Sequence, residues 1–318
     1  MGMKKLLFAL FVQLSLYGAP KVAVVVGDPF INNAIVTRLQ MDGFGEIRNY
    51  STELRIDFTD FMPDYLILDG YTGSAVDAMV LETKVLAAAH DVGVKKTLLL
   101  ASTAIYPEKA AIALREESLQ ELDTDSLKDP YQIAKITAFK QCKTYNGLKQ
   151  PRYILCPHPM LSGPHDTGFT QTSQHPLKNI ASRIVRCKWQ KNDFAVIAND
   201  GKASYEIMHV DDLAEALLFL LTQELDEQII NIGLGRDTNV KAIAEYVASH
   251  LKFREKIIFD PTCFDEVPRR VLDAKRITAL GWYPSWSTQD MIKDTVLWLE
   301  AQQKEPYKPG QESNLTLP

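Results

Sequence analysis

A tyrosine and a lysine four residues apart are the residues of this chain best suited to acid–base chemistry. They are Tyr131 and Lys135, in the segment DPYQIAKITAFKQCKTYNG. Asp129 is a suitable N-cap and Pro130 a suitable first helical residue, so a helix is predicted that places both side chains on one face. An ammonium beside a phenol favours the phenolate and lowers the pKa of the phenol, which suits proton exchange with a hydroxyl or a ketone. Taken alone, such a pair is more often a packing residue and a solvated charge.

Two hydroxyl residues upstream give this pair its significance. Ser102 and Thr103 lie in ASTAIYP (101–107), directly after the apolar run LLL. They are therefore expected at the carboxyl end of a buried strand, the edge at which open parallel sheets bind ligands. A hydroxyl at that edge can donate a hydrogen bond to the same substrate oxygen that the tyrosine protonates.

The elements that must position these residues follow a regular alternation. Short apolar runs alternate with helical stretches from Lys21 onward, as is typical of βαβ units. We therefore expect an α/β fold: a Rossmann-like doubly wound parallel sheet with a smaller C-terminal substrate-binding lobe. The expected strands are 21–28, 65–70, 96–102, 152–157 and 228–233. The expected helices are 32–41, 75–93, 129–147, 211–223 and 239–251.

The same pattern suggests how the chain divides. A Rossmann-type dinucleotide-binding domain is expected from residues 21–163 together with 205–235, because these hold the strands. Residues 164–204 and 236–303 do not continue the alternation of strands and helices and are expected to form the substrate lobe. Residues 304–318, rich in Pro, Gly, Ser and Asn, are expected to be a disordered tail.

Composition excludes several classes of protein. The net charge of −5 provides no basic field for nucleic acid, so an anionic ligand must be met by locally placed Arg and Lys. The four cysteines are scattered without metal-ligand spacing, so neither a zinc site nor a disulfide framework is expected. Lys4 and Lys5 precede an apolar run to Tyr17 that is either a signal-like leader or an apolar extension, and it is short for a stable membrane span. We favour the extension and a cytoplasmic location, while secretion or a periplasmic location stays open.

Several segments together resemble one family. The segments LLLASTAIYP and DPYQIAKITAFKQCKTYN are followed in order by SGPHD (162–166), MHVDDLAEALLFL (208–220) and PRRVLDAKRITALGW (268–282). This series resembles the GDP-L-fucose synthases, which are extended short-chain dehydrogenases/reductases, from Lys21 to about Leu299. The resemblance implies an NADP-dependent epimerase/reductase that converts GDP-4-keto-6-deoxymannose to GDP-L-fucose with NADPH. It also implies a homodimer in which helices 75–91 and 129–147 pair with those of a second copy.

The resemblance implies roles for individual residues. Ser102, Tyr131 and Lys135 match the catalytic set, with Ser102 and Lys135 also contacting the cofactor. His175 lies close to the position of an acid/base histidine, although a loop histidine without a catalytic role is an equal alternative. Gly27, Arg48 and Asp57 match cofactor-binding positions, with Arg48 placed for the 2′-phosphate of NADP.

Four residues match substrate-binding positions. Arg183 matches a cation that meets the substrate diphosphate, and alone it would be a surface charge. Arg269 is a second candidate for phosphate, although it or its neighbour Arg270 could instead pair with a carboxylate. Tyr205 stands where an arginine would contact the nucleotide, and Thr103 is expected beside the substrate.

The chain also departs from the family pattern. The loop GDPFINN (27–33) keeps Gly27 but has Phe30 and Asn33 at the other glycine positions, which weakens the approach to pyrophosphate. A helix N-terminus remains there and can still offer N–H groups. Ala104 replaces a cysteine acid/base residue and cannot transfer a proton. Two alternatives therefore stay open: another nucleotide-sugar epimerase, dehydratase or reductase of the extended type, or a non-catalytic dinucleotide-binding scaffold.

Overall fold

A computed structural model shows the arrangement of most of the chain. The described residues are 19–50, 56–71, 73–107, 113–120, 127–147, 153–167, 175–263 and 269–302. The apolar segment before Ala19 and the expected tail lie outside them. No helix within these ranges is long and apolar enough to cross a bilayer.

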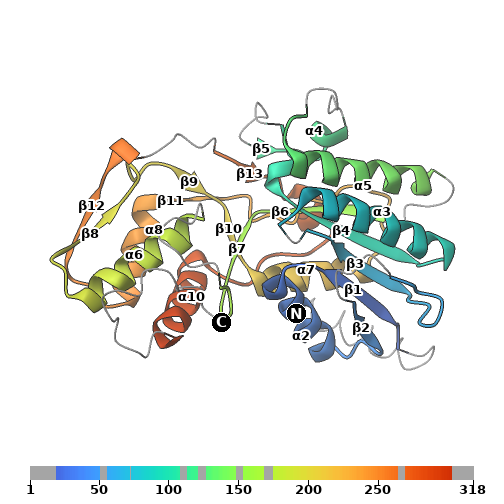
Figure 1. Ribbon diagram of the computed structural model, residues 1–318, viewed down its shortest axis with the longest axis horizontal. Coiled ribbons are helices and arrows are strands. Elements are labelled where there is room, and N and C mark those ends of the chain that lie inside the picture. Colours follow the sequence, from blue (N-terminus) through green and yellow to red (C-terminus); the bar gives the residue numbers. More distant parts are fainter. Residues whose placement is uncertain are drawn as a thin grey trace.

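A five-stranded parallel sheet forms the larger half of the molecule (Figure 1). Its strand order is β2-β1-β3-β4-β6. The strands are β1 (Val22–Val26), β2 (Ile47–Asn49), β3 (Tyr65–Asp69), β4 (Lys96–Ser102) and β6 (Tyr153–His158). Most of these strand residues are buried on both faces, as the continuous apolar runs require. The predicted doubly wound α/β fold is confirmed.

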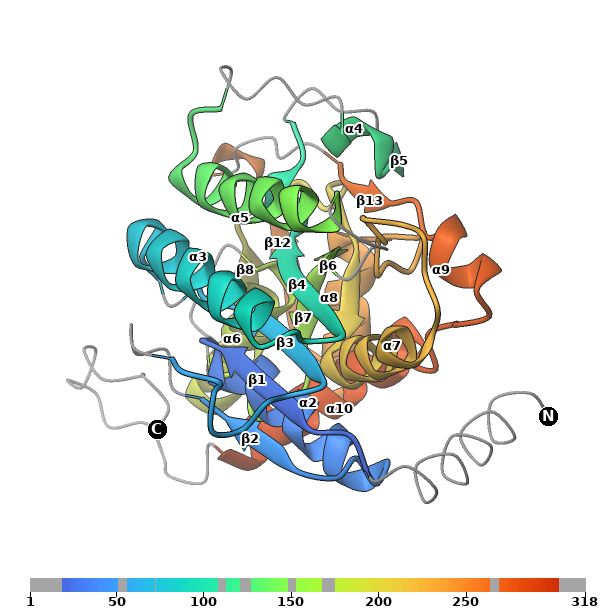
Figure 2. The ribbon, with the colours of Figure 1, turned by 90° about the vertical axis from the view of Figure 1, so that its right-hand side faces the viewer.

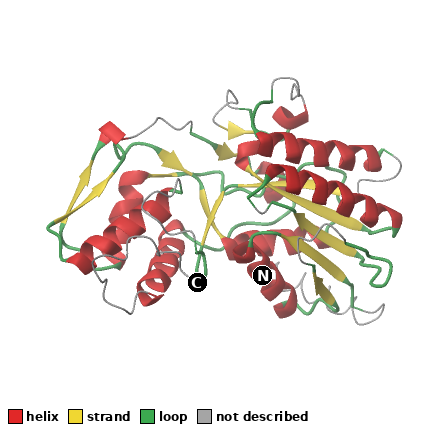
Figure 3. Ribbon diagram, viewed as in Figure 1, coloured by secondary structure: helices red, strands yellow, loops and turns green. Residues whose placement is uncertain are grey.

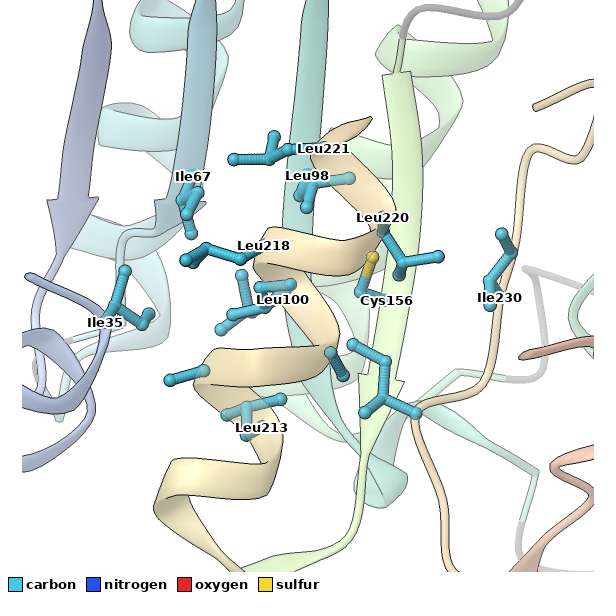
Figure 4. Packing of buried hydrophobic residues seen from close by; sticks show 14 of the residues in the cluster. Ile35, Ile67, Leu98, Leu100, Cys156, Leu213, Leu218, Leu220, Leu221 and Ile230 are labelled. Carbon is cyan, nitrogen blue, oxygen red and sulfur yellow. The ribbon is translucent and has the colours of Figure 1, made fainter. Parts of the chain in front are cut away.

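Helices cover both faces of this sheet (Figure 2). Helices α3 (Ala75–Asp91) and α5 (Pro130–Asn146) pack side by side on one face. Helices α2 (Pro29–Met41) and α7 (Val210–Thr222) cover the other. Leucines of α7, among them Leu213 and Leu218, lie over the apolar side chains of β3, β4 and β6 (Figure 4).

Helix α2 begins earlier than the sequence pattern indicated. It starts at Pro29 and not near Asn32, because the Asp28 carboxylate caps it by accepting the Phe30 N–H at 2.8 Å. Proline at the first helical position costs no hydrogen bond, since that N–H has no partner within a helix. The loop after β1 is therefore shorter than expected.

The expected strand 228–233 lies beside β6 but is not a regular strand. Its backbone pairs with β6 through Leu155 N–Gln228 O, Ile230 N–Leu155 O and Ile232 N–Pro157 O, at 2.9, 3.0 and 2.8 Å. Only one bridge, Leu155 to Ile229, has strand geometry. The segment extends the sheet edge without completing a sixth strand.

The smaller half is built from helices α6 (Pro176–Gln190), α8 (Val240–His250) and α10 (Thr288–Gln302) around an apolar core of their own (Figure 3). Short strands flank them and link the halves. They are β7 (Met160–Ser162), β8 (Phe194–Ile197), β9 (Ser204–Tyr205), β10 (Ile207–His209), β11 (Thr238–Asn239) and β12 (Lys256–Phe259), with a turn η3 at Pro261–Cys263. β8 pairs with β12, β7 with β10, and β9 with β11.

The chain returns to the larger half before it ends. Strand β13 (Val271–Leu272) pairs with β5 (Ala113–Leu114), near the short helix α4 (Glu117–Gln120). Helix α9 (Lys275–Ala279) follows, and its Ile277 and the fully buried Trp282 join the core under α7. The structure therefore puts residues 271–282 with the sheet, although the sequence pattern assigned them to the substrate lobe.

On α5, one of the two helices expected at a dimer interface, the small residues are buried inside the chain's own fold. Ala134, Ala138 and Cys142 of α5 are buried. They pack within the larger half, so they are not exposed to a second copy. Val76 and Ile133 are the large apolar side chains that α3 and α5 leave exposed, at 65% and 41%.

Candidate active site

Ser102 and Tyr131 meet at the carboxyl end of β4. The Ser102 backbone N–H donates a hydrogen bond to the Tyr131 hydroxyl oxygen at 2.7 Å. The Ser102 hydroxyl accepts from the Ala104 N–H at 3.3 Å and also hydrogen-bonds to the Tyr131 side chain. Tyr71, which follows β3, packs edge-on against the Tyr131 ring with centroids 5.2 Å apart. The strand ends and α5 thus bring a phenol and a hydroxyl together, as the sequence predicted.

Local capping explains why Tyr131 lies there. The Asp129 carboxylate caps α5 by accepting the Tyr131 N–H at 2.7 Å and the Gln132 N–H at 3.4 Å. The Gln132 side chain then donates to the carbonyls of Ala104 and Tyr106, at 2.8 and 3.1 Å. These two bonds join the start of α5 to the turn η1 (Thr103–Ile105) that follows β4. The predicted cap is confirmed.

Lys135 is enclosed by carboxylates. Its Nζ lies 2.7 Å from Asp69 Oδ1 and 2.5 Å from Glu82 Oε1, and its side chain is 0% exposed. Burial opposes the charged amine, but Asp69, Glu82 and Tyr131 outweigh this effect and raise the pKa of Lys135. An ammonium has three hydrogens, so one remains for a further acceptor. Asp69 and Glu82 were not among the predicted site residues.

The environment keeps Tyr131 neutral. Burial raises the pKa of its phenol, and Asp69 acts in the same direction. Lys135 lowers this pKa, as the sequence indicated, but the effect of burial is larger. The net shift is upward and not downward as expected, because the sequence could show the ammonium but not the desolvation or the carboxylate beside it. At neutral pH Tyr131 therefore holds its proton and can act as an acid.

A histidine that was not predicted also lies at this edge. His158 ends β6 and is paired with Ser102 in the β4–β6 register. Its Nδ1 donates to the Pro159 carbonyl oxygen at 2.9 Å, which leaves Nε2 as an acceptor. Burial lowers the pKa of His158 and keeps the ring neutral. Its place after a buried strand was the available signal, because polar residues at strand ends often serve a site.

The described residues fit a nicotinamide dinucleotide at its nicotinamide end. Tyr131 and the remaining hydrogen of Lys135 offer donors suited to a ribose hydroxyl and a substrate oxygen. Arg48, the residue predicted to meet a 2′-phosphate, lies in β2. Its Nη1 pairs with Asp60 at 2.8 Å, and its guanidinium lies 4.3 Å from the Phe61 ring centroid. Asp57, the other residue predicted here, caps its own turn by accepting the Thr59 N–H at 2.8 Å.

The loop after β1, which the sequence predicted to meet the pyrophosphate, carries a carboxylate, Asp28, at the start of α2. Gly27 follows β1 as predicted and donates its N–H to the Asp69 carbonyl at 2.8 Å. Asp28 occupies the N-terminus of α2, the position that would otherwise favour a phosphate, and Pro29 removes one N–H donor. Asn32 binds the Val26 carbonyl and Asn49, both at 3.0 Å, and so holds α2 against β1 and β2 in place of glycine packing. The loop therefore offers a dinucleotide fewer donors than an intact glycine fingerprint.

The histidine expected as an acid/base lies in the smaller half. His175 is the N-cap of α6, where its ring accepts the Lys178 N–H at 3.5 Å. Burial, together with the charge of Lys178, lowers the pKa of His175 to about 3. The ring is therefore neutral at physiological pH and stabilises a helix start. Its catalytic role stays a prediction.

The predicted substrate residues are distributed over both halves. On α6, Arg183 donates to Asn179 Oδ1 at 2.8 Å and to the Val196 carbonyl at 3.3 Å. Tyr205, in β9, packs partly buried on the core of the smaller half. Arg269 pairs with Asp237, with Nη2 and Oδ1 2.8 Å apart. Its neighbour Arg270 reaches the carboxyl end of β4, where it donates to the carbonyl of Thr103 at 3.1 Å.

Comparison with known proteins identifies the family. The sequence model of the NAD dependent epimerase/dehydratase family matches residues 73–233. A GDP-L-fucose synthase of Escherichia coli K12 is 30% identical over 231 residues, which are 69% of this chain and 71% of that protein. GDP-L-fucose synthase 1 of Arabidopsis thaliana is 29% identical over 290 residues, 84% of this chain and 89% of that protein.

A solved structure shows the same fold. The GDP-L-fucose synthetase of Naegleria fowleri bound to NADP superposes with a TM-score of 0.78 at 19% identity, and the match covers 91% of this chain and 95% of that one. The resemblance inferred from the sequence is confirmed. The chain belongs to the NAD dependent epimerase/dehydratase family.

Proposed function

We propose that this protein is an NADP-dependent nucleotide-sugar epimerase/reductase whose principal step is the reduction of a 4-keto sugar carried on GDP. Relatives named GDP-L-fucose synthase, at about 30% identity, support a GDP-linked substrate such as GDP-4-keto-6-deoxymannose. The retained Ser102, Tyr131 and Lys135 support catalysis over a purely binding role.

One observation carries the proposal: a neutral phenol lies at the carboxyl end of β4. The Tyr131 hydroxyl is 2.7 Å from the Ser102 N–H, and burial raises its pKa. Reduction of a ketone requires a proton donor for the developing alkoxide, and a neutral phenol meets that need. A phenolate would suit the reverse oxidation.

The residues divide the work of the reductive step. When bound, a reduced nicotinamide supplies the hydride to the ketone carbon. Tyr131 donates its proton to the ketone oxygen, and the Ser102 hydroxyl, which lies beside it, stabilises the same oxygen as charge develops there. For its third hydrogen to bind a ribose hydroxyl, Lys135, whose side chain is 0% exposed, must first be uncovered. Arg48 binds the 2′-phosphate and must exchange its contact with Asp60 to do so.

The acid/base groups for epimerisation are less well placed. Ala104 has no proton to exchange, and the neutral ring of His175 is engaged as the cap of α6. Epimerisation at a carbon beside the ketone requires a base that removes a proton from that carbon and an acid that returns a proton to its opposite face. We therefore propose that reduction is retained and that epimerisation is slow or lost.

The test separates the two steps. Purified protein is incubated with GDP-4-keto-6-deoxymannose and NADPH in deuterated water, and nicotinamide absorbance is followed. We expect NADPH oxidation with little deuterium at the carbons beside the ketone. Tyr131→Phe should lose at least about a hundredfold of the rate. Absence of NADPH oxidation with this sugar and with related GDP-keto sugars would refute the proposal.

A homodimer also remains our proposal. Val76 on α3 and Ile133 on α5 are exposed apolar residues on the two helices at which relatives of this type are expected to pair. Light scattering of the wild type and of Ile133→Lys tests it. A wild-type monomer would contradict it.

A further inference from the structure

The cluster around Lys135 contains two carboxyl groups but only one amine. Asp69 on β3 and Glu82 on α3 both contact the one ammonium, with side-chain exposures of 10% and 0%. Two ionised carboxylates and one ammonium would leave a net negative charge in a cluster that is almost fully enclosed. Such a charge is strongly disfavoured, and a group in this position protonates instead.

The two oxygens of Glu82 are in different surroundings. Oε1 accepts from Lys135 at 2.5 Å and from the Gly70 N–H at 2.9 Å. Oε2 is buried and has no hydrogen-bond partner within the described residues. An ionised oxygen without a partner costs more than a neutral one, so Glu82 is the carboxylate better suited to hold a proton. Burial also raises its pKa, although Lys135 opposes this.

Gly70 allows this arrangement. A Cβ at position 70 would lie 2.9 Å from Glu82 Cγ and 3.4 Å from Oε1. Only glycine lets the Glu82 side chain cross the end of β3 and reach Lys135 from α3. The cluster is therefore built by three separate elements and not by one local motif.

Other titratable groups face the cluster. Tyr131 acts on Lys135 from the same helix, and Cys142 faces Glu82. His158 of β6 lies close enough to interact with Asp69, with Lys135 and with Asp28 before α2. Of these, only Tyr131 meets the substrate in the proposed reaction, so the charge of the cluster reaches the chemistry through it.

We propose that Asp69 and Glu82 share one proton, so that together they carry a single negative charge that balances Lys135 and keeps Tyr131 a neutral proton donor. Both are positioning residues, because they act through Lys135 and Tyr131. The inference deepens the proposed function and rests on it for its catalytic consequence. The shared proton itself can be tested without measuring turnover.

The shared proton predicts that the two carboxylates substitute for each other. Asp69→Asn should cause Glu82 to lose its proton, and Glu82→Gln should leave Asp69 as the one carboxylate beside the ammonium. Each single variant then keeps one negative charge beside Lys135 and changes little. The double variant Asp69→Asn/Glu82→Gln removes both counter-charges, so burial lowers the pKa of Lys135 and the ammonium beside Tyr131 is lost at lower pH.

Infrared difference spectra of the protein without ligands at neutral pH test this directly. The neutral carboxyl band of the wild type should lose the same intensity in Glu82→Gln and in Asp69→Asn. Glu245→Gln, at an exposed glutamate of α8, should leave the band unchanged. A band that persists in Asp69→Asn, or that is unaffected by Glu82→Gln, would overturn the shared proton.

Turnover gives the second readout. The basic limb of the kcat–pH profile should move to lower pH in the double variant and not in either single variant. Equal, additive movements in the two single variants would show that both carboxylates are ionised and would overturn the inference. If the wild type reduces no keto sugar, the proposed function fails, while the infrared result still decides the shared proton.

Discussion

Two buried basic groups, one in each half of the molecule, differ in their ionisation. Lys135 lies under the catalytic edge of the sheet, and Asp69 and Glu82 raise its pKa despite complete burial. His175 caps α6 in the smaller half, where burial and the nearby Lys178 lower its pKa to about 3. Burial favours the neutral form of both groups, and the carboxylates reverse this only for the lysine. The comparison shows that charge is maintained where the proposed chemistry needs it and is absent where a histidine serves as a cap.

The largest effect should come from removing the charge of the lysine. Lys135→Met leaves a buried carboxylate without a cation, and we expect a loss of about 3–5 kcal/mol in the free energy of unfolding. Urea denaturation at neutral pH measures this loss. Lys143→Met, at an exposed lysine of the same helix, is the control and should change stability by less than about 0.5 kcal/mol.

The same substitution in the background Asp69→Asn/Glu82→Gln should cost much less, because no carboxylate is left unbalanced. Equal losses in both backgrounds would show that Lys135 contributes through packing and not through charge.

His175 predicts a pH dependence that originates in the smaller half. Its pKa is about 3 in the folded state against 6.5 for an unperturbed histidine, so only the unfolded chain takes up a proton between these values. Its contribution to stability is therefore complete above pH 6.5 and is lost as the pH falls toward 3. At pH 5 the loss should be about 2 kcal/mol.

His175→Asn keeps a capping side chain and removes the titration. The difference between its free energies of unfolding at pH 7.5 and pH 5 should be smaller than that of the wild type by about 2 kcal/mol. An identical pH dependence in both proteins would contradict a buried neutral His175.

Two helix caps allow a matched comparison between the halves. Asp129 caps α5 and Asn239 caps α8, where its Oδ1 accepts the Ala242 N–H at 2.8 Å. Alanine at either position should cost about 1 kcal/mol of stability, read from thermal denaturation. Only Asp129→Ala should also lower kcat, because it loosens the helix turn that carries Tyr131. Equal effects on turnover would argue against that positioning.

The smallest effect concerns the phosphate end of the site. Asp28→Asn keeps the acceptor for the Phe30 N–H but removes a negative charge from the N-terminus of α2. NADPH should bind about threefold more tightly, in line with a charge effect of a few tenths to one kcal/mol at a helix end. Fluorescence titration measures the dissociation constant. Weaker binding would show that the carboxylate contributes to the site.

Local patterns were sufficient to predict the elements that carry the catalytic residues. Strands β1, β3, β4 and β6 are continuous apolar runs, and the Asp129–Pro130 pair marks the start of α5, so their positions could be read from neighbouring residues. The short strand pairs such as β8 with β12 could not, because a pairing of four residues across 62 positions leaves no periodic signal.

The candidate site was predictable only in part for the same reason. The four-residue spacing of Tyr131 and Lys135 is visible in the sequence, whereas Asp69 and Glu82 are 66 and 53 residues from the lysine. Nothing local distinguishes Glu82 from a solvated glutamate on a helix. The upward shift of the Tyr131 pKa also depends on burial, which only the folded arrangement reveals.

Gly70 makes the catalytic edge vulnerable at a position that bears no functional group. Any side chain there would crowd Glu82 and push it away from Lys135, which lies on a different helix. A scan for functional residues that considers only reactive side chains would overlook it. In a redesign of this edge for another substrate, Gly70, which has no side chain, is the position to leave unchanged.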